Sequence, residues 1–135
     1  MTATLSTAAS RDKVKTPDES YLYTMDMQKL FRKTSAGVID ESLTGGTPTC
    51  SCVSAEQLLT SGAAVATGDL TIESVAVNSA ALLGDSGQVV SIGYGIQARI
   101  TGGVAGGRYK LKFKCVGTTQ SNTLEEFGYL QVQNT

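Results

Sequence analysis

The chain has 135 residues and a formal net charge of −1, from 11 lysines and arginines against 12 aspartates and glutamates. This near-balance argues against a whole-domain electrostatic grip on nucleic acid or on an anionic membrane. Histidine is absent, which excludes Ser-His-Asp and Cys-His catalysis and removes the commonest zinc ligand. With 15 glycines and only 17% charged residues, the composition favours one soluble, non-enzymatic domain of short elements joined by tight turns.

The first 16 residues are rich in threonine, serine and alanine, and they hold too few apolar side chains to join a core. We therefore expect an extended arm over residues 1–16, followed by a single domain over residues 17–135. Two interpretations are open: a mobile tail, or an arm that orders on a partner through Leu5, Arg11, Lys13, Val14 and Lys15. No signal peptide is expected in this stretch, and no apolar run approaches the ~20 residues of a membrane helix.

The middle of the chain alternates between strand patterns and turns. Residues 21–26 have the period of two that predicts a strand, and a helical turn is expected just after them. Residues 49–53 are β-prone, and residues 54–59 predict a helical turn with Ser54 as its N-cap. Residues 70–77 predict a strand whose apolar phase slips once, as at a bulge.

The last third carries the clearest pattern. Apolar residues of 109–115 alternate with three cations, which predicts an amphipathic strand with Lys110, Lys112 and Lys114 on its outer side. A predicted strand over 89–100 precedes it, and another over 124–132 follows a turn. We interpret 89–133 as a three-stranded antiparallel meander. Together these patterns predict an all-β fold, an antiparallel immunoglobulin-like β-sandwich with an extended N-terminal arm.

The three lysines mark either a solvated face or a contact with a protein. Nucleic acid is the weaker interpretation, because the pattern shows no exposed aromatic residues between the lysines for bases to stack on. We expect no nucleic-acid partner and no membrane partner.

No metal site, cofactor site or catalytic residue is expected. Cys50 and Cys52 form a C-x-C pair, and with Cys115 they make an odd number. Free buried thiols are favoured, and a disulfide from Cys115 to either of the others stays open. The glycine run at 102–107 leads into a strand, so it predicts a hairpin turn and not a phosphate loop. Adjacent carboxylates such as those at 125–126 point to opposite faces of a strand and form no catalytic pair.

One segment resembles a known family. It runs from Gln97 to Val132 and combines TGG-x-x-GG-x-Y at 101–109, Gly117-Thr118-Thr119, Leu124-Glu125 and Leu130-Gln131-Val132. The N-terminal half matches in outline through Tyr21 to Asp26, Ile39-Asp40 and Thr71 to Val77. In these features the chain resembles the fibre–tail adaptor proteins of tailed phages.

That resemblance implies a structural subunit of the virion tail, folded in the host bacterial cytoplasm. Its partners would be other tail or neck subunits and the tail fibres, with several copies arranged around the tail axis. Two alternatives remain open. A capsid decoration, or cement, protein would bind between capsomers in hundreds of copies, and an adhesive or carbohydrate-binding β-sandwich would present surface aromatics to sugars.

Overall fold

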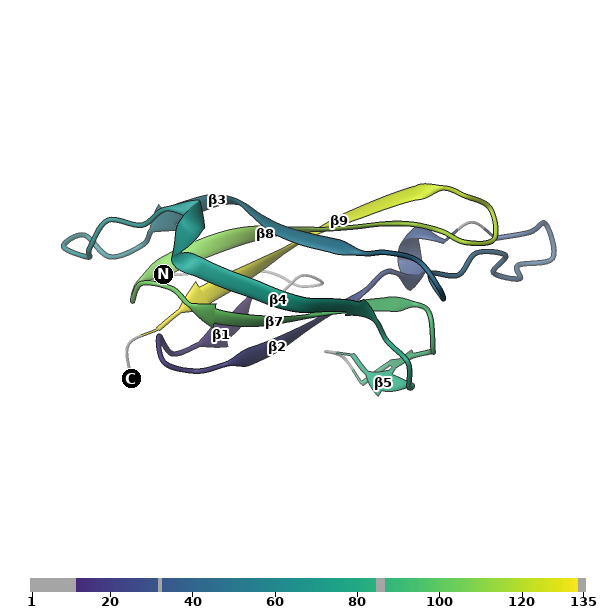
Figure 1. The fold of residues 1–135 in the computed structure, drawn as a ribbon, viewed down its shortest axis with the longest axis horizontal. Coiled ribbons are helices and arrows are strands. Elements are labelled where there is room, and N and C mark those ends of the chain that lie inside the picture. Colours follow the sequence, from purple (N-terminus) through teal and green to yellow (C-terminus); the bar gives the residue numbers. More distant parts are fainter. Residues whose placement is uncertain (1–11, 32, 85–86, 134–135) are drawn as a thin grey trace.

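The computed structural model describes residues 12–31, 33–84 and 87–133, and the regular elements of this part of the chain are almost all β-strands (Figure 1). Its strands are β1 (Lys13–Lys15), β2 (Tyr21–Asp26), β3 (Thr49–Gln57), β4 (Leu70–Val77), β5 (Leu82–Leu83), β6 (Val89–Val90), β7 (Gly95–Gly102), β8 (Gly107–Val116) and β9 (Thr123–Val132). Two short 3-10 helices, η1 (Gln28–Leu30) and η2 (Thr67–Asp69), follow β2 and precede β4. The all-β class expected from the sequence is confirmed.

The longer strands form two sheets that enclose one core. One sheet has the order β1-β9-β8-β3 and the other has the order β2-β7-β4, while β5 and β6 form a separate hairpin. Alternate residues of each strand point between the sheets, as the period-two pattern requires. A single cluster of buried apolar side chains fills the space, drawn mainly from Tyr23, Ile96, Ala98, Ile100, Tyr109, Leu111, Phe113, Cys115, Leu130 and Val132. The domain is therefore sandwich-like.

The amphipathic strand predicted at 109–115 is confirmed by β8. Phe113 and Leu111 are fully buried, whereas the three lysines between the apolar residues point away from the core. The bulge predicted in the strand at 70–77 is also confirmed, because the register of β4 against β7 shifts between Glu73 and Ala76.

The expected three-stranded meander is wrong. The strand expected over 89–100 is divided into β6 and β7, and β7 pairs with β2 and β4. Of the three expected strands, only the last two, β8 and β9, form a hairpin, so the glycine run at 102–107 is not the hairpin turn that the sequence predicted. The glycine-rich segment after β7 crosses from one sheet to the other, with positive φ angles at Gly102, Gly103 and Gly106. The Tyr109 hydroxyl closes this crossing by accepting a hydrogen bond from the Val104 amide at 2.9 Å. An amphipathic strand packs its apolar side into the same core in either arrangement, so alternation alone does not choose the sheet.

The helical turn expected at 54–59 is also wrong, because β3 continues through Gln57. A register shift between Cys52 and Ser54 lets the strand absorb one extra residue, and pairing with β8 resumes at Ser54. Hydrogen bonding to a neighbouring strand has overridden the local capping signal of Ser54, as tertiary context commonly does.

The first strand belongs to the sheet, which corrects the boundary expected at residue 16. Lys13–Lys15 lies parallel to β9, with Lys13 opposite Leu130 and Lys15 opposite Val132. The small number of apolar side chains in this segment argued against a strand, but hydrogen bonds, including those of polar side chains, hold β1 in the sheet. The Lys15 side chain is 1% exposed, and its ammonium donates to the carbonyls of Thr16 at 2.6 Å and Gly102 at 2.6 Å.

The strand order is compatible with the immunoglobulin-like arrangement, in which strands B, E and D form one sheet and C, F and G the other. Here β2, β7 and β4 correspond to the first set and β3, β8 and β9 to the second. Such domains also commonly fix a tyrosine hydroxyl at the start of strand F to nearby backbone, the place that Tyr109 takes in β8. The immunoglobulin-like assignment itself stays a prediction.

Candidate interaction surface

The outer face of the four-stranded sheet holds most of the residues that the sequence singles out. We define this outer face as the side of β1, β9, β8 and β3 that is turned away from the β2-β7-β4 sheet. Residues directly opposite each other on neighbouring strands share a face, so the strand registers identify its members. They are Val14 on β1, Gln131, Tyr129, Phe127 and Glu125 on β9, Arg108, Lys110, Lys112 and Lys114 on β8, and Glu56, Ser54, Ser51 and Thr49 on β3.

Three of these residues form the lysine stripe, which we define as Lys110, Lys112 and Lys114. They lie on one side of β8 at intervals of about 7 Å, given a rise of ~3.4 Å per residue. The Lys114 ammonium lies 3.8 Å from a carboxylate oxygen of Glu125. The Lys110 ammonium lies 4.5 Å from the centre of the Phe127 ring. Among the described residues, Lys112 has no ion-pair partner. The stripe is therefore a weakly compensated positive surface.

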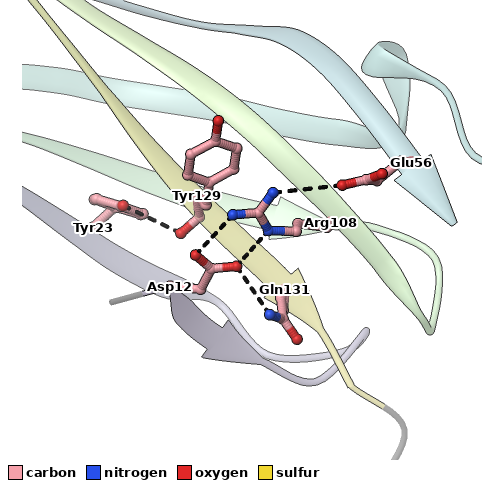
Figure 2. A network of polar contacts seen from close by, with 6 residues as sticks. All are labelled: Asp12, Tyr23, Glu56, Arg108, Tyr129 and Gln131. Atoms are coloured by element: carbon pink, nitrogen blue, oxygen red, sulfur yellow. Dashed lines mark hydrogen bonds and ion pairs between the residues drawn. The ribbon is translucent and has the colours of Figure 1, made fainter. Parts of the chain in front are cut away.

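The other end of the outer face is a compact polar cluster around Arg108 (Figure 2). The Arg108 guanidinium donates to both carboxylate oxygens of Asp12, from Nε at 2.6 Å and from Nη2 at 3.2 Å. Gln131 Nε2 donates to the same carboxylate at 2.9 Å. On the far side, Arg108 Nη1 lies 3.5 Å from Glu56. We call Asp12, Glu56, Arg108, Tyr129 and Gln131 the Arg108 cluster.

Arg108 and Asp12 form a bidentate arginine–carboxylate pair, which holds the guanidinium and the carboxylate in one orientation. The Tyr129 ring lies beneath the guanidinium, with its centre 3.7 Å from Arg108 Cζ. The backbone carbonyl of Tyr129 accepts a hydrogen bond at 3.2 Å from the Tyr23 hydroxyl, which belongs to the opposite sheet (Figure 2). The cluster therefore ties β1, β8, β9 and β3 together and touches the core.

Protonation states follow from these contacts. Burial by itself raises the pKa of Asp12, but hydrogen bonds from Arg108 and Gln131 and the charge of Arg108 outweigh it, so the pKa lies below its ordinary value. The hydrogen bond to Asp12 is the main cause that raises the pKa of Arg108. Both groups are therefore charged at neutral pH, and each satisfies the other.

The predicted contact residues of the N-terminal segment do not act together. Val14 is exposed on the outer face, opposite Gln131. Lys13 points to the other side of β1, where its ammonium lies 6.0 Å from the centre of the Tyr23 ring. Lys15 is buried and bonded internally, so it presents no surface for a partner, and burial lowers its pKa. Leu5 and Arg11 lie outside the described residues.

Two aromatic residues beside the stripe were missed from the sequence. Phe127 lies opposite Lys112, Tyr129 lies opposite Lys110, and the Phe127 side chain is 40% exposed. A signal for both was available. The turn between β8 and β9 is a hairpin, so pairing Val116 with Thr123 and counting outward places each aromatic residue beside a lysine.

The thiols have the properties of core residues. All three cysteines are free, and Cys115 is buried. Burial raises the pKa of Cys50 to about 12, and burial also raises the pKa of Cys52 and of Cys115. Thiolates are the nucleophilic and metal-binding form, so this environment disfavours both activities. Within the ranges that the structure describes, no group of three or more Cys, Asp or Glu side chains is placed to hold a metal ion.

The outer face therefore combines the Arg108 cluster, whose charges are paired within the domain, with the weakly compensated lysine stripe, an arrangement suited to binding another molecule. Across the described ranges, no helix is both long and apolar enough to cross a membrane. Comparison of the chain with protein-family models, with curated proteins and with solved structures gives no match.

Proposed function

We propose that the chain is a non-enzymatic structural subunit of a tailed-phage virion, a fibre–tail adaptor that links the tail or neck to the tail fibres. In this role it folds in the host cytoplasm and then takes its place in the tail, in several symmetry-related copies. The motif resemblance over residues 97–132 supports this role. The role is also supported by an all-β domain that exposes lysines on the outer face of one sheet and apolar side chains on the separate β5–β6 hairpin.

The observation that carries the proposal is an exposed apolar pair on the β5–β6 hairpin. Leu83 lies directly opposite Val89, and these side chains are 75% and 57% exposed. Ile92, which follows the hairpin, is also exposed. Adjacent apolar side chains at such exposure are commonly covered by another subunit. A tip of this kind suits a protein that works inside an assembly.

The tip is held in a defined position by buried polar bonds. Asn78 is buried, and its Oδ1 accepts hydrogen bonds from the Gly93 and Gly95 amides at 3.2 and 2.9 Å. Its Nδ2 donates to the carbonyls of Ala80 and Ser91, each at 2.9 Å. A preorganised tip loses less entropy when it docks, which favours a structural contact.

The copy number of the chain in purified virus particles tests the role. We expect roughly a dozen copies per particle, because a closed ring around the tail axis holds few copies compared with the capsid surface. Hundreds of copies would overturn the adaptor role in favour of a capsid decoration protein. Complete absence from particles would overturn both virion roles.

A pair of variants then tests the tip itself. Leu83→Asp should strongly reduce incorporation into particles while the isolated domain melts at an unchanged temperature. The control is Leu58→Asp, because Leu58 is 50% exposed and directly follows β3. The end of β3 lies far from β5 in the fold (Figure 1). Equal incorporation of the two variants would contradict a contact through the β5–β6 tip.

A further inference from the structure

We propose that the β3 edge docks an extended, acidic strand of a partner protein, whose carboxylates alternate along the strand and meet the lysine stripe. This inference goes beyond the virion role and does not depend on it. It rests on the open edge of the four-stranded sheet, on the side chains that line it and on the charges beside it.

The first observation is the edge of the four-stranded sheet at β3. Among the described strands, β3 ends the order β1-β9-β8-β3 and has β8 as its only hydrogen-bonded neighbour. Edge strands are usually protected by lysine, by proline or by a bulge. Thr49–Gln57 contains neither lysine nor proline, and its bulge lies between Cys52 and Ser54. The half from Thr49 to Cys52 therefore keeps regular geometry at the edge and can pair with an added strand.

The second observation is the row of small hydroxyl side chains that separates this edge from the stripe. Each lysine lies directly opposite a hydroxyl residue of β3, in the pairs Thr49–Lys114, Ser51–Lys112 and Ser54–Lys110. Serine and threonine are too short to cover a lysine. The long lysine side chains can thus extend across β3 toward whatever lies beside its edge.

The third observation is the charge available there. Within the described part of the chain, Lys112 has no ion-pair partner. The contact of Lys114 with Glu125 is long at 3.8 Å and exposed, so exchange for another carboxylate costs little. The only charged residue of β3 is Glu56, near the end of the strand, and its carboxylate already contacts Arg108. An incoming anion at the Thr49–Cys52 half therefore lies near Lys112 and Lys114, and this half of β3 contains no acidic residue to repel it.

The spacing identifies the chemistry of the partner. Side chains on one face of an extended strand repeat at about 7 Å, the same interval as the lysine stripe. Carboxylates at every second residue of an added strand would therefore stay in register with the lysines. Nucleic acid fits less well, because the Phe127 and Tyr129 rings already lie against Lys110 and Arg108, and base stacking needs open rings.

The experiment uses the full chain and a synthetic peptide of alternating threonine and glutamate, eight residues long. Binding is measured by titration of the labelled peptide, and amide hydrogen exchange locates the site. We expect the peptide to bind and to slow exchange at amides of Thr49–Cys52. Lys112→Gln and Lys114→Gln should each weaken binding about two- to fivefold, the range for an exposed ion pair. Lys29→Gln is the control, since Lys29 is an exposed lysine on η1 paired with Glu126.

A peptide of the same composition, with four threonines followed by four glutamates, tests the register. Equal binding of the block and alternating peptides would overturn the proposal, because it would show attraction without strand pairing. Unchanged exchange at Thr49–Cys52, or no binding, would overturn it as well. If an eight-nucleotide oligothymidine binds more tightly than the alternating peptide, the proposal is overturned in favour of a nucleic-acid partner. None of these results bears on the copy number in particles, so the virion proposal stands or falls separately.

Discussion

Arg108 and Lys112 lie on the same side of the same strand, four residues apart, yet they have opposite surroundings. Arg108 is bound by Asp12 on one flank and by Glu56 on the other, and its guanidinium lies over the Tyr129 ring. Lys112 has a serine on one flank and a phenylalanine on the other. A charge that is satisfied within the domain stabilises the fold, whereas a charge without an internal partner is available to another molecule.

The comparison depends first on β8 having a buried side and an outer side. Phe113→Ala should lower the free energy of unfolding by about 3–5 kcal/mol, because it empties a fully buried aromatic position. Its neighbour on the outer side provides the control, since Lys112→Ala should change stability by less than about 0.5 kcal/mol. Chemical denaturation of both variants measures the difference. Equal losses would show that the two sides of β8 are assigned wrongly.

The second prediction separates the Arg108 cluster from the segment that precedes it. Deleting residues 1–11 leaves every described contact of β1 in place, so the melting temperature should stay near that of the full chain. Deleting residues 1–16 removes Asp12 and Lys15 together with the strand between them. Three of the lost side-chain hydrogen bonds, Lys15–Gly102, Arg108–Asp12 and Gln131–Asp12, should alone cost roughly 3 kcal/mol, at about 1 kcal/mol for each net hydrogen bond. The newly exposed edge of β9 adds to this loss.

Thermal melts of the two truncated chains decide this point. A 1–16 deletion that melts like the 1–11 deletion would mean that β1 is dispensable and that Asp12 does not anchor the sheet. The binding of the acidic peptide to the lysine stripe should be unaffected in the 1–11 deletion, which keeps the two regions distinct.

The third prediction concerns Glu41, a second charged residue whose hydrogen bonds are made within the domain, near the end of β8. Glu41 is buried, and its carboxylate accepts hydrogen bonds from the amides of Ser42, Thr119 and Gln120, which fixes the turn between β8 and β9. Glu41→Gln should cost about 2 kcal/mol, the scale of hydrogen bonds to a charged group. Chemical denaturation at neutral pH measures this loss.

The pH dependence gives a second readout for Glu41. Burial alone would raise the pKa of Glu41, but the backbone amides lower it below the ordinary value of 4.5. A carboxyl group with a lowered pKa stabilises the fold fully above its ordinary pKa, and the stabilisation is lost as the pH falls through the folded pKa. Denaturation below pH 4.5 should therefore show a steeper loss for the native chain than for Glu41→Gln. Parallel curves would contradict the role of Glu41.

Local pattern was sufficient for several of the strands but not for their partners. The alternation of 109–115 predicted both sides of β8 correctly, because burial of one face imposes that period whatever lies beyond it. The pairing of β7 with β2 and β4 was missed because the same alternation results whichever strands lie beside it. The extension of β3 beyond Val53 was missed because its bulge breaks the alternation and Ser54 imitates a helix cap.

The candidate surface was predicted only in part. The alternation within β8 is enough to place the three lysines on one face. Their neighbours on that face are set by the registers of β8 against β3 and against β9, which the alternation does not contain. The bond between Asp12 and Arg108 joins positions 96 residues apart, and no local pattern contains it. Lys15 shows the converse error, since a cation in a polar segment predicts exposure, yet three backbone carbonyls accept its hydrogen bonds.

The most direct test of the contrast between the two regions is a matched pair of thermal melts, for Arg108→Gln and for Lys112→Gln. Each variant removes one positive charge from the outer side of β8. We expect Arg108→Gln to lose about 1–2 kcal/mol, because Asp12 is left without its two-pronged partner, and Lys112→Gln to melt within about 1 °C of the native chain. Equal shifts for the two variants, or a larger shift for Lys112→Gln, would contradict the division of this face into a structural cluster and an open stripe.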